Sequence, residues 1–182
     1  SFMHQGQICM SVEKILVQEA VFDDFLARFV ERAAKLKVGD PTADNGHVIG
    51  PLINDKQAGK VKEQIDDALA KGAQVVLGGN VDGRFVEPTI LTSVTPDMKV
   101  YVEETFGPVV PVIPYRTDEE AVAIANDSEY GLSSGVITRD ESRGLAIASA
   151  LQTGMCHINC SSVNDEPLSL IHISEPTRQI RI

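Results

Sequence analysis

The first clear pattern in the chain is an apolar run followed by hydrophobic residues at helical spacing. Residues 15–17 are all aliphatic, which predicts a short buried strand. Apolar side chains then recur at steps of three and four over residues 22–36, which predicts a helix with one apolar stripe. The stripe consists of Phe22, Phe25, Leu26, Phe29, Val30, Ala33 and Leu36. Such a stripe is typical of a helix that packs on a core rather than of a cofactor site.

A polar loop from Gly39 to Asn54 separates this helix from a second one. Asn54 is a favourable N-cap, and Gln57 three residues later resembles the second member of a capping box. Gly72 is placed to end the helix. Its expected buried face consists of Val61, Ile65, Ala68 and Leu69.

The middle of the chain reads as extended segments. A strand is expected at residues 75–77. Residues 85–94 are expected to be extended, and Pro88 within them indicates either an irregularity or a strand at the edge of the sheet. Residues 99–102 and 109–115 are strand-like runs on either side of a polar and aromatic turn. The second run is apolar almost throughout, as expected of a strand covered on both faces.

The C-terminal part alternates between the two kinds of element. A capping box at Thr117 indicates the start of a helix, and a strand is expected at residues 135–138. Asp140 is a favourable cap for a second helix, which is expected to run to about residue 151. A last strand is expected at residues 155–160. The apolar face of the first of these helices is Ala121, Val122, Ile124 and Ala125. This order predicts an α/β fold with a largely parallel sheet, right-handed crossovers and helices on its faces.

Composition narrows the class of protein. A chain of 182 residues that is 43% hydrophobic can bury one sizeable core, so we expect one soluble domain. Acidic residues outnumber basic ones by 26 to 16, and the basic residues are scattered, which argues against a nucleic acid or an anionic membrane as partner. The sequence shows neither a membrane-spanning run nor a secretory signal, and its three cysteines do not form a disulfide framework. A reducing compartment, the cytoplasm, is therefore expected.

Cys9 is the candidate nucleophile that the residues themselves suggest. It follows Gly6-Gln7 and precedes the strand at 15–17, so its thiol is expected on a loop beside a strand. A cysteine attacks only as a thiolate, which requires nearby N–H groups, a helix N-terminus or a base. The residues alone leave a second interpretation open, in which Cys9 is a small buried hydrophobic residue.

The histidines and the other cysteines do not suggest a metal site. On a strand, Cys156 and Cys160 would face one side and His157 the other, so the three could not converge on a metal, and we expect them to pack in the core. His4 and His47 fall in predicted loops with no acid or thiol at ligand spacing. No metal site is predicted.

Four motifs occur in the order found in aldehyde dehydrogenases, and the chain resembles this family from Ser1 to about Pro167. They are Gly6-Gln7-Ile8-Cys9, Phe85-Val86-Glu87-Pro88-Thr89, Glu103-Glu104-Thr105-Phe106-Gly107-Pro108-Val109, and the segment from Asn126 through Tyr130-Gly131-Leu132. Residues 2–11 look most like the benzaldehyde, salicylaldehyde and vanillin dehydrogenases. Ser11 departs from the small residue more usual in the wider family.

The resemblance implies a function for three residues. Cys9 would be the catalytic nucleophile, its thiolate adding to an aldehyde before hydride passes to NAD or NADP and water hydrolyses the thioester. The backbone N–H of Cys9 would help to bind the oxyanion. Glu104 would bind the hydroxyls of the nicotinamide ribose, although without the resemblance a solvated turn residue is the favoured interpretation. Phe106 would pack beside the nicotinamide.

The resemblance also implies that other parts of the enzyme lie elsewhere. In the family the general-base glutamate, the oxyanion-hole asparagine and the dinucleotide-binding domain precede the cysteine, and this sequence has no counterpart of them. We therefore expect residues 1–167 to be part of the catalytic domain of a longer, homo-oligomeric enzyme, and the isolated chain to be inactive.

The Phe-Gly-Gly segment that the resemblance leads us to expect after Glu166 is absent. Residues 168–182 resemble the translation of a sequencing adaptor and are predicted to be a non-native, unstructured tail, so His172 is given no role.

Two other functions remain as hypotheses. A thiol-redox or acyl-thioester protein could use Cys9 without nicotinamide, but it would need a resolving cysteine nearby. A non-catalytic assembly module would form oligomers and leave Cys9 unreactive. The sequence does not distinguish between aldehydes, or between NAD and NADP.

Overall fold

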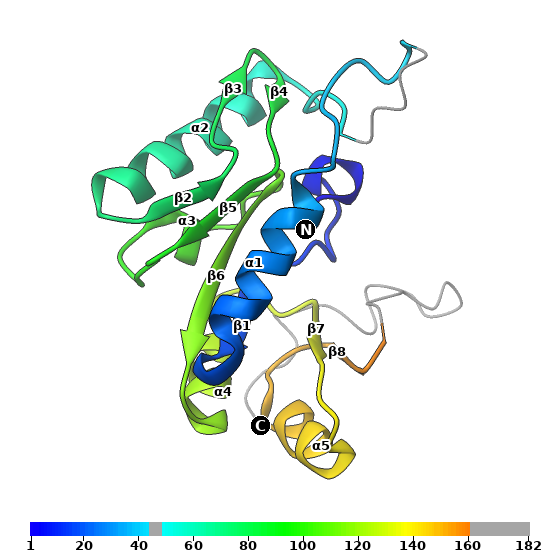
Figure 1. Cartoon of the computed structure of the whole chain (residues 1–182), viewed down its shortest axis with the longest axis vertical. Helices are drawn as coiled ribbons and strands as arrows, with labels where there is room; N and C mark the ends of the chain where they lie inside the picture. Colours follow the sequence, from blue (N-terminus) through cyan, green and yellow to red (C-terminus); the bar gives the residue numbers. More distant parts are fainter. Residues whose placement is uncertain (44–48, 161–182) are drawn as a thin grey trace. The chain divides into compact units, whose positions relative to one another are not determined.

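The computed structural model describes residues 1–43 and 49–160. Two compact units make up the chain, Ser1–Arg116 and a second that begins at Thr117 (Figure 1). The predicted single domain to residue 167 and tail at 168–182 extend beyond the described residues and stay predictions. Within the described residues, no helix has both the length and the apolar character that crossing a membrane requires.

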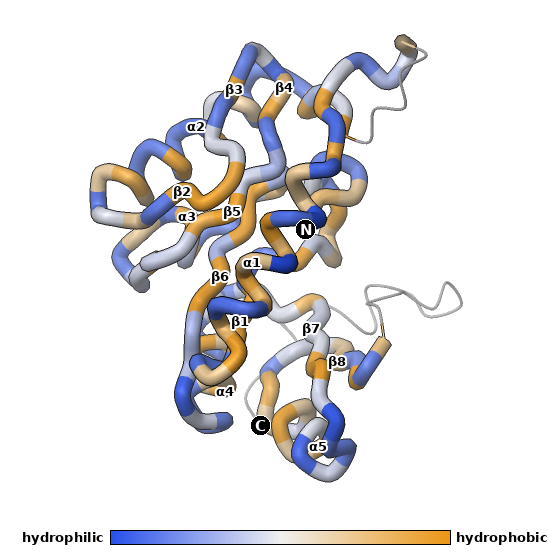
Figure 2. The backbone as a smooth tube through the Cα atoms, viewed as in Figure 1, coloured by the Kyte–Doolittle hydropathy of each residue, from blue (hydrophilic) through white to orange (hydrophobic). Residues whose placement is uncertain are grey.

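The first unit is built on a mixed, mostly parallel four-stranded sheet, which confirms the predicted α/β class. The strands lie in the order β1-β6-β5-β2, with β6 parallel to both β1 and β5, and β2 antiparallel to β5. Their bounds are Ile15–Gln18 for β1, Gln74–Leu77 for β2, Thr89–Thr92 for β5 and Val109–Tyr115 for β6. The first five residues of β6 are buried, as predicted for a strand covered on both faces. Hydrophobic residues are concentrated on β2 and β6 (Figure 2).

Helix α1, Phe22–Ala33, packs on a hydrophobic core through most of the predicted apolar stripe. Phe25 is the exception, because it is exposed, although its ring stacks on that of Phe29 with centroids 5.7 Å apart. The helix ends at Ala33, before the predicted end near Leu36, yet Leu36 still packs against the same core. The ring of Phe2 stacks on that of Phe29 with centroids 5.8 Å apart, which anchors the N-terminal segment to the helix. The buried members of the core are Phe2, Val17, Ala33, Ile49, Ile90, Val110 and Val112.

Helix α2, Asp55–Ala70, begins at its predicted cap. The Asn54 side chain accepts a hydrogen bond from the Gln57 N–H at 2.8 Å. Gly72 follows the helix with a φ of 99°, which glycine adopts without a steric cost. The buried face differs from the prediction at Leu69, which is 45% exposed because it lies at the edge of the stripe beside the fully buried Ala68.

The strand-like interpretation of residues 99–102 is wrong, because they form the short helix α3, Lys99–Val102. The periodicity of such a brief apolar run does not distinguish a strand from a helix. The carboxylate of Asp67, on α2, accepts a hydrogen bond from the Lys99 N–H at 2.8 Å and so holds the start of this helical turn.

The predicted break near Pro88 is confirmed, since strand β4, Phe85–Val86, ends there and β5 begins at Thr89. β4 pairs with β3, Val81–Asp82, in a separate hairpin.

The second unit contains the predicted alternation of helix and strand. Its elements are α4, Asp118–Asn126; β7, Ser133–Val136; α5, Glu141–Ala150; and β8, Met155–Ile158. Strands β7 and β8 are parallel, and β7 starts two residues before the prediction because Ser133 already pairs with Met155. The predicted caps are confirmed, since Thr117 accepts from the Glu120 N–H and Asp140 from the Arg143 N–H.

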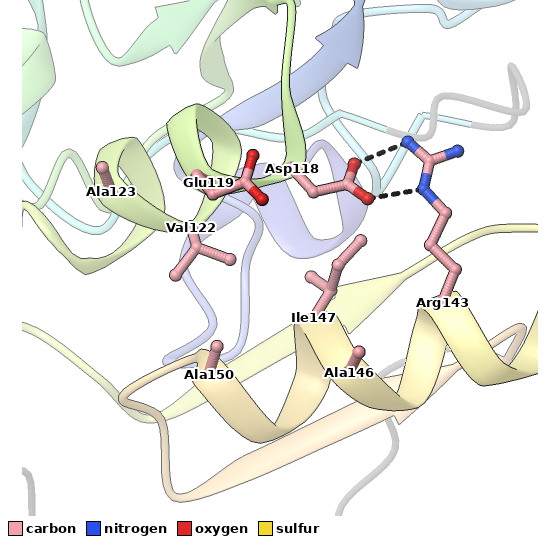
Figure 3. A pocket seen from close by; sticks show the side chains of 8 residues that line it. All are labelled: Asp118, Glu119, Val122, Ala123, Arg143, Ala146, Ile147 and Ala150. Carbon is pink, nitrogen blue, oxygen red and sulfur yellow. Dashed lines mark hydrogen bonds and ion pairs between the residues drawn. The ribbon is translucent and has the colours of Figure 1, made fainter.

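Helices α4 and α5 border an open, mainly apolar pocket of about 430 Å³ (Figure 3). At one end the Arg143 guanidinium donates two hydrogen bonds to the Asp118 carboxylate, at 2.7 and 2.5 Å. This pairing lowers the pKa of Asp118. The remaining lining residues are Glu119, Val122, Ala123, Ala146, Ile147 and Ala150.

Candidate active site

The loop that carries Cys9 is held in place while the cysteine itself is exposed. The Ser11 N–H donates to the Ile8 carbonyl at 2.8 Å and closes a turn around Cys9. Ahead of it, the Gln7 side chain accepts a hydrogen bond from the Ile53 N–H at 2.9 Å, which ties the loop to the segment before α2. The structure therefore presents Cys9 on an ordered loop and does not bury it as a small hydrophobic residue.

Gly6 brings this loop into contact with a second segment. It has a φ of 71°, and a Cβ at this position would lie 2.1 Å from the carbonyl oxygen of Gly107. No side chain can occupy that space, so only glycine permits such a close approach of the two backbones. The two residues before it, His4 and Gln5, also have positive φ values, of 49° and 59°. The segment Met3–Gly6 therefore has positive φ values at three consecutive residues and is not a regular helix.

The neighbouring turn is the polar and aromatic segment 103–108. Phe106 adopts a φ of 52°, a conformation that residues with a Cβ rarely occupy. At Gly107 a Cβ would lie 2.6 Å from a methyl group of Val61, so this residue is packed directly on α2. The turn is held between the loop on one side and α2 on the other. The side chains of Glu104 and Phe106 are half-buried.

Three side chains of α2 bind backbone carbonyls of this turn: Gln57, Lys60 and Gln64, of which Gln64 donates to the Glu104 carbonyl at 3.5 Å. The Gln57 amide donates to the carbonyls of Thr105 and Phe106, at 2.8 and 3.1 Å. The Lys60 ammonium donates to the Glu104 carbonyl at 2.5 Å. Sequence reasoning assigned Gln57 only to the start of the helix, where its backbone N–H does bond Asn54. Its side chain joins segments 48 residues apart, which a local pattern does not reveal.

Glu13 is the residue at this site that sequence reasoning missed. Its carboxylate accepts hydrogen bonds from the backbone N–H groups of Thr105 and Phe106, at 3.2 and 3.5 Å. Burial raises the pKa of Glu13; the two N–H bonds act in the opposite direction, and the nearby charge of Glu104 adds to the increase. The only sequence signal is an acidic residue next to a predicted strand, which is usually a solvated charge.

The three residues predicted for the site therefore lie on two adjoining segments of one unit. The loop of Cys9 and the turn of Glu104 and Phe106 meet at the Gly6–Gly107 contact and through Glu13. Among the described residues, no hydrogen bond joins Cys9 to Glu104 or Phe106 directly. The arrangement presents a thiol, a carboxylate and an aromatic ring from a backbone that is fixed at several points.

Comparison with known proteins decides the family. The family model described as "Aldehyde dehydrogenase family" matches residues 1–171. The chain belongs to the aldehyde dehydrogenase family. This confirms the resemblance seen in the four motifs.

Relatives of known name in this family include enzymes named for aromatic aldehydes. A salicylaldehyde dehydrogenase of Pseudomonas putida is 46% identical over 91% of this chain and 34% of its own length. A benzaldehyde dehydrogenase of Bacillus subtilis (strain 168) is 45% identical with the same coverage. The chain therefore spans about a third of the length of the curated relatives that it matches.

Solved aldehyde dehydrogenases share the fold. The crystal structure of a salicylaldehyde dehydrogenase from Pseudomonas putida G7 complexed with salicylaldehyde matches with a TM-score of 0.87 and 46% identity, over 91% of this chain and 34% of that one. A succinate-semialdehyde dehydrogenase from Burkholderia pseudomallei matches with a TM-score of 0.86 and 42% identity, over 91% and 35%. The fold class predicted from the sequence is that of this family.

The expectation for the C-terminal cysteines needs a correction. Strand β8 ends at Ile158, and Asn159 has a φ of 55°, so the chain turns before Cys160. As a result the Cys160 sulfur lies 3.8 Å from Nδ1 of His157 instead of on the opposite face. The expected core packing is also wrong for Cys160, which is exposed because it lies beyond the end of the strand. Among the described residues, no group of three or more His, Cys, Asp or Glu side chains is placed to hold a metal ion. His4 is exposed in the N-terminal loop, and His47 lies outside the described residues.

Because of the Gly6–Gly107 contact, we expect a methyl group added at Gly6 to reduce the stability of the fold strongly. Gly6→Ala should lower the free energy of unfolding by about 2–4 kcal/mol, because the added Cβ collides with the Gly107 carbonyl and the φ is unfavourable for alanine. Urea unfolding followed by circular dichroism measures the change. Gly59→Ala is the control: Gly59 is an exposed residue of α2 with open space around its Cβ position, so the change should stabilise by about 0.5–1 kcal/mol. A Gly6→Ala protein as stable as the wild type would contradict the close packing of loop on turn.

The raised pKa of Glu13 predicts a pH dependence of stability with a definite sign. The folded state keeps the Glu13 proton to a higher pH than the unfolded state does, so unfolding releases a proton between the two pKa values. Stability from this group therefore falls as pH rises through a window that starts near the ordinary glutamate pKa of about 4.3. Urea unfolding at a series of pH values should show Glu13→Gln gaining stability relative to the wild type across that window. A difference that is flat, or that changes in the opposite direction, would contradict the burial of Glu13.

Proposed function

We propose that Cys9 is the catalytic nucleophile of an NAD(P)-dependent aldehyde dehydrogenase, to whose catalytic domain this chain contributes. The observation that carries the proposal is the Gly6–Gly107 contact, which joins the loop of an exposed thiol to the turn of Glu104 and Phe106. The substrate class that we infer is an aromatic aldehyde, oxidised to its carboxylic acid. Support comes from the relatives named for salicylaldehyde and benzaldehyde.

Cys9 supplies the covalent chemistry in this proposal. Its thiolate sulfur attacks the carbonyl carbon, a C–S bond forms, and the carbonyl electrons move to oxygen. The backbone N–H of Cys9 donates a hydrogen bond to that developing oxyanion, as preorganised donors do in acyl transfer. After oxidation to the thioester, water adds to the same carbon, the C–S bond breaks, and the carboxylic acid leaves with Cys9 restored. We assign no residue of this chain to the activation of that water.

Glu104 and Phe106 suit a nicotinamide cofactor. Among the described residues, no side chain donates a hydrogen bond to the Glu104 carboxylate, so its oxygens are available as acceptors for a pair of ribose hydroxyls. The half-buried ring of Phe106 offers a flat apolar surface for a nicotinamide ring. When bound, the cofactor would accept the hydride from the carbon attached to the Cys9 sulfur. A relative named benzaldehyde dehydrogenase [NAD(+)], from Pseudomonas putida, is 43% identical over 92% of this chain.

The proposal extends to the surroundings of the whole enzyme. Cys9, Cys156 and Cys160 are free thiols, as expected in a reducing compartment such as the cytoplasm. We infer from the family resemblance that the whole enzyme is a homo-oligomer with a small-molecule aldehyde as its partner.

A hybrid enzyme tests the nucleophile assignment. In the hybrid, residues 1–166 of this chain replace the matching third of the Pseudomonas putida salicylaldehyde dehydrogenase. We expect NADH formation with salicylaldehyde, and a loss of about 10³-fold or more in Cys9→Ser because the covalent step needs the thiolate. Cys160→Ser, which removes another exposed thiol, should retain activity. The isolated 182-residue chain should not turn over aldehyde, although its Cys9 should react with iodoacetamide.

Two results would count against this proposal. A hybrid whose activity survives Cys9→Ser would show that Cys9 is not the nucleophile. Aldehyde oxidation by the purified isolated chain would contradict the expectation that the chain lacks essential parts of the site.

A further inference from the structure

Two consecutive peptide groups of the turn at residues 103–108 form hydrogen bonds at both ends. In the peptide between Glu104 and Thr105, the carbonyl accepts from Lys60 and the N–H donates to Glu13. In the next peptide, between Thr105 and Phe106, the carbonyl accepts from Gln57 and the N–H again donates to Glu13. A peptide group is a rigid plane, so a bond at each end fixes its orientation.

The orientation of these planes decides where the two functional side chains point. The first plane joins the Cα of Glu104 to that of Thr105, and the second joins Thr105 to Phe106. Because Phe106 has the unfavourable φ of 52°, its conformation persists only where the surroundings hold it. Gln57 and Lys60 bind only carbonyls of the turn, and the carboxylate of Glu13 binds both N–H groups.

We propose that Glu13 is a positioning residue that sets the directions of Glu104 and Phe106 by holding the N–H groups of Thr105 and Phe106. The inference rests on the proposed function in that Glu104 and Phe106 are taken as the cofactor-binding pair. Glu13 follows Cys9 by four residues and leads directly into β1. The segment that presents the nucleophile would therefore also orient the side chains that bind the nicotinamide. The positions of the thiol and of the cofactor surface would then be fixed relative to each other.

Burial supports a specific role for this carboxylate. A carboxylate withdrawn from water is costly unless hydrogen bonds compensate it, and here the compensation comes from backbone N–H groups of the turn. Glu19, at the other end of β1, provides a contrast, since it is exposed and lies 3.9 Å from Arg116. Changing it removes the same charge from the same segment without touching the turn.

Nuclear magnetic resonance of the ¹⁵N-labelled 182-residue chain tests the bonds themselves. In the wild type, the amide protons of Thr105 and Phe106 should shift with pH and share one midpoint, because one carboxylate accepts from both. Glu13→Gln should abolish this common shift, and Glu19→Gln should retain it. Amide protons that titrate identically in Glu13→Gln would overturn the proposal, whatever the function of the protein.

Steady-state kinetics of the hybrid enzyme test whether Glu13 affects the binding of the cofactor. Glu13→Gln should raise KM for NAD⁺ about fivefold, the size of one weakened hydrogen-bond contact, and Glu13→Leu should raise it further. KM for salicylaldehyde should be unchanged in both. A general loss of folding would instead lower the apparent kcat, because less enzyme is active, and would leave KM for NAD⁺ unchanged. An unchanged KM for NAD⁺, or parallel changes in all constants, would overturn the link to the cofactor. An inactive parent hybrid would speak against the proposed function, and the amide titration would still decide whether Glu13 holds the turn.

Discussion

The backbone of Gly6 lies so close to Gly107 that a single added methyl group would sit 2.1 Å from the carbonyl oxygen. This contact fixes the relative position of the two segments of the candidate site, because it joins the segment that carries Cys9 to the turn that carries Glu104 and Phe106. The segment that carries Cys9 is also anchored at two other points. Phe2 stacks on α1 before the loop, and Glu13 leads into β1 after it. The exposed thiol therefore projects from a backbone whose two ends are fixed by the core.

The polar groups of the turn explain how a segment with little regular structure stays rigid. Its carbonyls accept hydrogen bonds from α2, and its N–H groups donate to Glu13, so the turn needs no secondary structure of its own to satisfy them. The side chains of Glu104 and Phe106 take no part in these backbone contacts. In the proposed function the turn sets the direction of these two side chains, which supply acceptor oxygens and an aromatic surface to the cofactor.

Local signals in the sequence predicted much of the fold. The stripe of α1 and the caps at Asn54 and Asp140 depend on residues within a few positions of one another, and the structure contains them. The interpretation failed where tertiary contacts decide, as at residues 99–102, where Asp67 helps to hold a helical turn. Glu13 was missed for the same reason, because its partners lie 92 and 93 residues away. Cys9 was a candidate from its own surroundings in the sequence, and the family motifs assigned roles to Cys9, Glu104 and Phe106, which stay predictions. The contact between their segments is long-range, so no local pattern predicted it.

In the proposed function, Cys9 forms the covalent intermediate at this site. The most direct test of this assignment is mass spectrometry of the hybrid enzyme, quenched with acid during turnover of salicylaldehyde and NAD⁺ and then digested. We expect a salicyloyl group on the peptide that contains Cys9, and none on the other cysteine-containing peptides. An active hybrid that carries the acyl group on a different residue would contradict this assignment.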